Sequence, residues 1–151
     1  GPDSYFQRWI SDDAERLEGE KIKLVKDDKI RRVVLCTGKV YYDLYEEREK
    51  RGIDDVYLLR VEQLYPFPLK GLVGELSRFK KADVVWCQEE PKNMGAWTFV
   101  DPYLEWVLGQ AGSKVKRATY VGRAASAATA TGTMSRHMAQ LKAFLDEAFA
   151  A

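Results

Sequence analysis

The sequence predicts an α/β domain built as a three-layer sandwich, with helices on both faces of a mostly parallel sheet. Four short apolar runs predict strands, and the runs are continuous rather than alternating, as in strands covered on both faces. Segments with helical periodicity separate the runs, so we expect parallel βαβ crossovers. The runs are Val33-Val34-Leu35-Cys36, Val56-Tyr57-Leu58-Leu59, Val84-Val85-Trp86-Cys87 and the weaker Ala118-Thr119-Tyr120-Val121.

The first predicted helix lies between the first two runs and ends at Gly52, a residue that readily takes the left-handed conformation after a helix. Two i,i+4 pairs of opposite charge, Glu46 with Lys50 and Glu47 with Arg51, support its exposed side. Its apolar stripe consists of Val40, Tyr41, Leu44 and Tyr45.

Three more helices are predicted from apolar stripes at helical spacing. In the middle one, Asp101 is expected to be the N-cap and Pro102 the first-turn proline. The stripes are Leu69, Leu72, Val73, Leu76 and Phe79, then Tyr103, Leu104, Trp106 and Val107, and finally Met134, Met138, Leu141, Leu145 and Ala148.

Residues 1–30 are predicted to be an arm or linker to a preceding domain that is absent here, and residues 31–151 the α/β domain. The stretches Asp12-Asp13-Ala14-Glu15 and Lys26-Asp27-Asp28-Lys29 are expected to be solvated. Three aromatic residues in the arm, together with part of Trp97, are expected to form an exposed or self-associated apolar surface that docks on a neighbouring domain. They are Tyr5, Phe6 and Trp9.

Composition narrows the class of protein. The 151 residues are 46% hydrophobic, and 24 Lys and Arg nearly balance 23 Asp and Glu, so nothing general suggests nucleic acid or an acidic membrane as partner. No apolar run reaches the length of a spanning helix, and the first residues lack the regions of a signal peptide. Cys36 and Cys87 are expected to be buried free thiols in a reducing compartment, although the sequence leaves a bridge open. We expect a soluble cytoplasmic domain.

Chemistry-bearing motifs are scarce, and we predict no catalytic, cofactor-binding or metal-ligating residue. The single histidine, His137, has no Ser or Cys partner at a recognisable spacing, and the cysteines lack a metal-binding pattern. No dinucleotide-binding or P-loop fingerprint occurs. Glu89 and Glu90 form the one adjacent acidic pair near a strand end, which could serve in acid–base work or merely bind backbone amides.

The predicted strand ends suggest an anion site. Ligands of open parallel sheets bind at the carboxyl ends of the strands, and a free helix N-terminus there attracts anions. Thr37, Gly38, Lys39, Arg60 and Arg123 follow or end strands, so three cations could converge there. We predict that the cations are unpaired and bind an anion weakly. In the alternative, Arg60 pairs with Glu62 or Glu89 and Lys39 is solvated.

The loop after the third run is predicted to be a structural turn. Pro91 favours an extended Glu90, and Gly95 permits a positive φ before a helix start at Ala96-Trp97. The carboxylates of Glu89 and Glu90 are expected to accept hydrogen bonds from neighbouring backbone or cationic groups.

Three long blocks resemble the C-terminal domain of 2-oxoglutarate dehydrogenase, and the similarity runs from about Lys21 to Phe149. Between Gly122 and Gly132, Ala124 and Thr129 stand where the family typically has proline, so this loop is expected to be looser. The blocks are Leu35-Cys36-Thr37-Gly38-Lys39-Val40-Tyr41-Tyr42-Asp43-Leu44, Leu59-Arg60-Val61-Glu62-Gln63-Leu64-Tyr65-Pro66-Phe67-Pro68 and Trp86-Cys87-Gln88-Glu89-Glu90-Pro91-Lys92-Asn93-Met94-Gly95-Ala96-Trp97.

The resemblance implies a transketolase C-terminal-type domain with five strands, one of them an antiparallel edge. It implies that a longer parent chain, an oxidoreductase of the tricarboxylic acid cycle, holds thiamine diphosphate and Mg²⁺ in other domains. The parent decarboxylates 2-oxoglutarate and succinylates lipoyl groups of the succinyltransferase component of a multienzyme complex. This domain would be non-catalytic and would pack on the preceding domains and the second subunit of a homodimer. The location would be the bacterial cytoplasm, or the mitochondrial matrix in a eukaryote.

Three functions therefore stay open. The first is an assembly domain of the dehydrogenase. The second is a regulatory module for acetyl-CoA or an adenine nucleotide, because family members can be regulated by such ligands; Lys39, Arg60 and Arg123 would then meet the phosphates. The third is a free-standing α/β enzyme that uses Glu89 or Glu90, which the resemblance disfavours.

Overall fold

The sheet of this chain has five strands in the order β1-β3-β2-β4-β5. The computed structural model describes residues 9–16, 22–122 and 132–151. Strands β2 to β5 are parallel, and β1 pairs with β3 in the antiparallel sense, as the family resemblance implied. All four predicted apolar runs are strands. The strands are β1 (Trp9–Ile10), β2 (Arg32–Cys36), β3 (Val56–Val61), β4 (Asp83–Gln88) and β5 (Thr119–Gly122).

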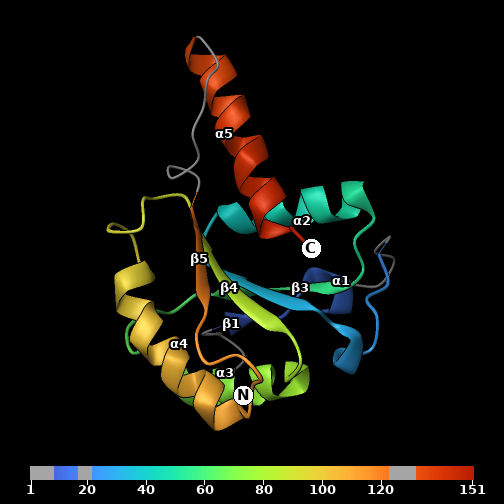
Figure 1. Ribbon diagram of the computed structural model, residues 1–151, viewed down its shortest axis with the longest axis vertical. Coiled ribbons are helices and arrows are strands. Elements are labelled where there is room, and N and C mark those ends of the chain that lie inside the picture. Colours follow the sequence, from blue (N-terminus) through green and yellow to red (C-terminus); the bar gives the residue numbers. More distant parts are fainter. Residues whose placement is uncertain (1–8, 17–21, 123–131) are drawn as a thin grey trace.

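Helices cover both faces of the sheet, which confirms the three-layer sandwich. Figure 1 shows α2 and α5 on one face and α3 and α4 on the other. Short 3-10 turns, η2 (Asp27–Lys29) and η3 (Ser77–Phe79), complete the described elements. The helices are α1 (Asp13–Arg16), α2 (Val40–Arg51), α3 (Leu69–Leu76), α4 (Trp97–Ala111) and α5 (Thr133–Ala148).

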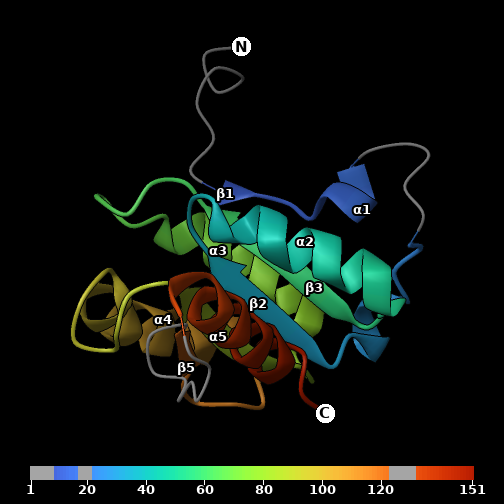
Figure 2. The ribbon, with the colours of Figure 1, turned by 90° about the horizontal axis from the view of Figure 1, so that it is seen from above.

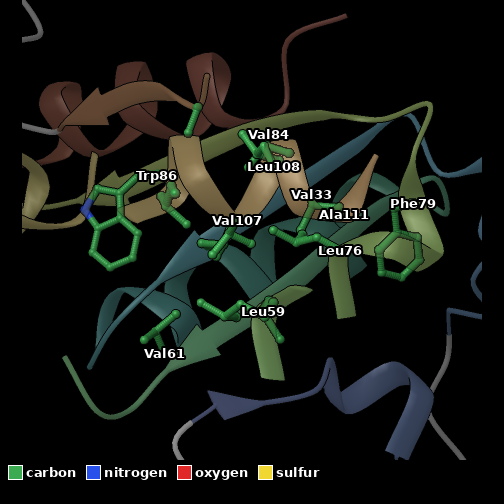
Figure 3. Packing of buried hydrophobic residues seen from close by; sticks show 14 of the residues in the cluster. Val33, Leu59, Val61, Leu76, Phe79, Val84, Trp86, Val107, Leu108 and Ala111 are labelled. Carbon is green, nitrogen blue, oxygen red and sulfur yellow. The ribbon is translucent and has the colours of Figure 1, made fainter. Parts of the chain in front are cut away.

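Two apolar cores result, because successive residues of a strand point to opposite faces. In β3, Leu58 belongs to the core under α2 and α5, whereas Leu59 belongs to the core under α3 and α4. Figure 3 shows part of the second core, in which Trp86 of β4 and Val107 of α4 lie among the labelled side chains. The continuous apolar runs are therefore explained by burial on both sides.

Two predicted features of the first crossover helix are confirmed. Helix α2 ends at Gly52, which has φ +67° and donates its N–H to the carbonyl oxygen of Glu49. Glu47 and Arg51 form the expected i,i+4 ion pair at 2.7 Å.

Of the two starts that the sequence suggested for α4, the cap at Asp101 is wrong, whereas the start at Ala96-Trp97 after Gly95 is confirmed. The helix begins one turn earlier at Trp97, and Pro102 lies inside it. The Asp101 carboxylate instead accepts a hydrogen bond from Arg117 at 2.6 Å. The side-chain oxygen of Gln88 takes the N–H of Trp97 at 2.9 Å, so a distant glutamine does the capping that the sequence suggested for Asp101.

The first described residues are less exposed than predicted. Asp12 is fully buried, although Lys26 to Lys29 are exposed as expected. Trp9 packs against the core under α3, where any side chain at Gly71 would collide with its indole ring. Trp97 is only 6% exposed. The predicted apolar surface is therefore wrong for both tryptophans, whereas Tyr5 and Phe6 lie outside the described residues.

Helix α5 is buried along its second half only. Leu145 and Ala148 of the predicted stripe are buried, whereas Met134 and Met138 are exposed. Figures 1 and 2 show the helix extending from the α2 face of the sheet. Among the described residues, no helix has both the length and the apolar character needed to cross a bilayer.

Candidate functional site

The crevice between β2 and β4 is the place where this topology favours a ligand. From β2 the chain passes through α2 to β3 on one side, and β4 pairs with β2 on the other side. Ligands of open α/β sheets bind at such a switch point, outside the carboxyl ends of the strands. A pocket of about 530 Å³ opens there. Its lining comes from the ends of β2 and β4, a loop after β3 and the start of α4: Thr37, Leu64, Tyr65, Gln88, Glu90, Gly95, Ala96 and Phe99.

Gln88, the last residue of β4, organises the wall of this pocket. The side chain is 3% exposed, and its oxygen accepts hydrogen bonds from the indole N–H of Trp86 and the backbone N–H of Trp97, both at 2.9 Å. Its amide nitrogen donates towards three backbone carbonyl oxygens, those of Glu90, Pro91 and Met94, at 2.7 to 3.2 Å. One side chain therefore joins the strand, the loop and the helix.

The segment of Glu89, Glu90, Pro91 and Gly95, for which a structural turn was predicted, connects β4 to α4. Gly95 has φ +66°, and a Cβ atom there would lie 3.0 Å from the Glu90 carboxyl group. The Tyr120 hydroxyl adds a hydrogen bond to the Glu90 carbonyl oxygen at 2.7 Å. Gln88 holds this turn by hydrogen bonds to three of its backbone carbonyl oxygens, a role that sequence reasoning missed. That the two carboxylates also bind neighbouring donors stays a prediction.

Arg60 lies on the opposite side of the sheet from the pocket and is 8% exposed. Its guanidinium stacks over the Tyr41 ring at 4.1 Å and lies 3.5 Å from the Asp13 carboxylate and 4.0 Å from that of Glu62. The expectation that Arg60 is unpaired is therefore wrong. Sequence reasoning named Glu62 but missed Asp13, because that residue comes from the presumed arm.

The predicted anion-site residues are only partly brought together. Thr37 lines the pocket on the α4 side, whereas Arg60 points towards α2. Gly38, with φ +70°, and Lys39 are exposed before α2. Arg123 lies outside the described residues. Whether an anion binds at Lys39 and Arg60 stays a prediction, and it would have to compete with the carboxylates of Asp13 and Glu62.

A buried ion pair fixes the first residues to the domain. Arg48 of α2 and Asp12 are both fully buried, and the guanidinium donates two hydrogen bonds to the carboxylate. The same carboxylate accepts the N–H of Leu58 in β3 at 2.8 Å, at the point where the β1–β3 ladder has ended. Tyr41 accepts the N–H of Asp13 at 3.0 Å, and burial raises the pKa of this phenol.

The two cysteines and the single histidine lie in surroundings that do not favour a reactive role. Cys36 and Cys87 are buried free thiols on neighbouring strands, as predicted, and burial raises the pKa of both well above the ordinary value. A thiol that resists ionisation is a poor nucleophile. His137 is exposed on α5. No group of three or more His, Cys, Asp or Glu among the described residues is arranged to hold a metal ion.

Comparison with known proteins identifies the family of this chain. The family model described as "2-oxoglutarate dehydrogenase C-terminal" matches residues 1–149. The chain belongs to this family. It is similar to the 2-oxoglutarate dehydrogenase E1 components of Brucella anthropi and Brucella ovis, with 69% identity over 97% of the chain in each case. The chain spans 15% and 14% of the length of these two relatives.

In this member of the 2-oxoglutarate dehydrogenase C-terminal family, the three blocks that carry the resemblance follow the strands β2, β3 and β4. The first runs from β2 into α2, the second leaves β3 for the pocket loop, and the third contains the Gln88 turn and the start of α4. The blocks that carry the resemblance are therefore the segments around the carboxyl ends of the central strands.

Proposed function

We propose that this chain is the C-terminal assembly domain of a 2-oxoglutarate dehydrogenase E1 component. The observation that carries the proposal is the 69% identity to proteins of that name over 97% of the chain. The side chains at the strand ends support a structural role. Gln88 makes hydrogen bonds to its own loop and to the start of α4. Arg60 forms an ion pair with Asp13 and stacks on the Tyr41 ring.

In this proposal the full chain decarboxylates 2-oxoglutarate and passes the succinyl group to lipoyl groups of the succinyltransferase component, a step of the tricarboxylic acid cycle. The domains outside these 151 residues hold thiamine diphosphate and Mg²⁺, and the cofactor supplies the carbanion chemistry of decarboxylation. The present domain packs on the preceding domains and on a second subunit, in the bacterial cytoplasm or the mitochondrial matrix. Its own residues shape and support that assembly without taking part in the reaction.

Truncation of the full-length chain tests the proposal. We expect the full chain with thiamine diphosphate and Mg²⁺ to decarboxylate 2-oxoglutarate as a dimer. A chain that lacks these 151 residues should lose both the activity and the dimer, and the isolated 151 residues should have no activity. Light scattering and CO₂ release measure the two properties. Unchanged activity and dimerisation after the truncation would contradict the assembly role.

The same assay tests the third function, a free-standing enzyme. Decarboxylation by the isolated 151 residues would instead support a free-standing enzyme based on Glu89 or Glu90. A regulatory module for acetyl-CoA or an adenine nucleotide is the alternative proposal. It is less favoured because Arg60, which would bind the phosphates, already pairs with carboxylates in this structure.

A further inference from the structure

Helix α4 carries a second aromatic surface that its own domain covers only in part, since Phe99 packs against the core and Tyr103 stacks on the buried Phe67 ring at 5.5 Å. Its apolar core face includes Trp97, Leu104 and Val107. Phe99, Tyr103 and Trp106 follow one another at i, i+4 and i+7 and therefore share a different side of the helix. Tyr103 is 38% and Trp106 51% exposed, values that are high for aromatic residues placed in a row.

The loop after β3 extends this surface. The ring of Tyr65, 85% exposed, lies 6.4 Å from that of Phe99, and Phe99 lies 5.1 Å from Tyr103. We call Tyr65, Phe99, Tyr103 and Trp106 the aromatic stripe. Aromatic residues of this kind supply much of the binding energy of protein interfaces.

The pocket at the switch point lies at one end of the aromatic stripe, because Tyr65 and Phe99 belong to both. Its volume of about 530 Å³ is ample for a large apolar side chain. Among the described residues that line it, Glu90 alone carries a charge. The site therefore combines an apolar cavity, an aromatic ledge and one carboxylate.

We propose that the aromatic stripe and the pocket bind a segment of the dehydrogenase chain that lies outside these 151 residues. The segment has a large apolar side chain for the pocket and a neighbouring Arg or Lys for Glu90. The inference rests on the proposed function and names the surface it uses. The relatives have 85 to 86% of their length outside the matched region, which leaves ample chain to cover the stripe. A second copy of the aromatic stripe, whose four residues carry no cation, would leave Glu90 without the partner charge that the Arg or Lys of the segment supplies.

Cross-linking in the full-length chain identifies the occupant. The photoreactive residue p-benzoylphenylalanine replaces Tyr103, and the cross-linked peptides are sequenced by mass spectrometry. We expect a peptide from the dehydrogenase chain outside this domain, containing an apolar residue next to Arg or Lys. A cross-link to the stripe of a second copy, a cross-link to another protein, or no cross-link would overturn the proposal.

Oxidative footprinting of the same full-length chain measures whether the stripe is covered. Trp86, which is fully buried in this domain, is the internal reference. We expect Trp106 to react about as slowly as Trp86, whereas a rate several times higher would overturn the proposal. The footprint reports burial and not turnover, so a failure of the proposed decarboxylation would leave it unchanged.

A pair of matched variants of α4 tests the energetic role of the stripe. Trp106→Asp places a charge on it, and Thr98→Asp places the same charge at an exposed position outside it. In the full-length chain we expect only Trp106→Asp to speed the release of this domain by limited proteolysis. Equal rates of release for the two variants would overturn the proposal.

Discussion

Gln88 is the residue on which the pocket wall depends. Gln88→Leu keeps the size of the side chain but removes the acceptor for Trp86 and Trp97 and the donor for three carbonyl oxygens. We expect the free energy of unfolding to fall by about 2–3 kcal/mol, because at least one buried donor loses its acceptor. Urea unfolding measures the change, with the exposed Lys92→Leu as control. Equal midpoints for the two variants would show that water replaces the glutamine.

At the scale of the elements, the Asp12–Arg48 pair joins the first described residues to α2 and β3. Among the described residues, Asp12→Ala leaves the fully buried guanidinium with the Val56 carbonyl oxygen at 3.1 Å and the Glu49 carboxylate at 3.7 Å. We expect a loss of about 3–5 kcal/mol of unfolding free energy, the usual cost of breaking a buried pair. The exposed Asp28→Ala is the control.

A double variant tests whether Asp12 and Arg48 stabilise the fold as a pair. In Asp12→Ala/Arg48→Met no buried cation remains, so the loss should be smaller than the sum of the two single losses. Strict additivity in urea unfolding would mean that the two side chains do not act as a pair.

The contact between α2 and α5 gives stability a pH dependence. Hydrogen bonds from Lys142 and Arg51 lower the pKa of Asp146 in the folded protein. The stabilisation is thus present above the unfolded pKa, about 3.9, and is lost as pH falls through the lower folded pKa. Because the Asp146 side chain is 46% exposed, Asp146→Asn should cost less than about 1 kcal/mol near neutral pH. Urea midpoints of variant and parent should converge once the pH lies below the folded pKa of Asp146. A gap that persists there would contradict the assignment.

The elements also show what the sequence could predict. The central strands and α2 follow from local patterns, namely apolar runs, a helical stripe and a closing glycine. Asp12 could not be assigned in this way, because its burial depends on Arg48, which is 36 positions away. The capping role predicted for Asp101 failed for the same reason, since Gln88 on another element accepts the N–H of Trp97 at the start of α4. In the site, Thr37 and Gly95 were named from turn and strand-end rules and Glu62 was named as a partner of Arg60, whereas the second partner, Asp13, could be found only from the fold.

For the whole molecule, the predicted anion site remains to be tested by titration. We expect acetyl-CoA or an adenine nucleotide to bind weakly and with an affinity that falls as salt is added, because Arg60 must first leave Asp13 and Glu62. Lys39→Ala should weaken the binding relative to the parent chain. Lys92→Ala, at another exposed lysine, should leave the binding unchanged. Calorimetry that detects no binding at millimolar ligand, or equal binding by both variants, would leave these residues as ordinary surface and ion-pair groups.

Strand β1 has a consequence for the solubility of the molecule. It is only two residues long, yet it lies along the outer edge of β3, whose six residues are all buried. An uncovered edge of that composition is a template for strands of other molecules. A chain shortened to begin at Ser11 would lose β1 but keep Asp12, would offer this edge and is expected to form fibrils that bind thioflavin T. The intact chain should not do so under the same conditions, and equal dye binding by the two would contradict the idea. In this interpretation, β1 protects the edge of β3 from pairing with strands of other molecules.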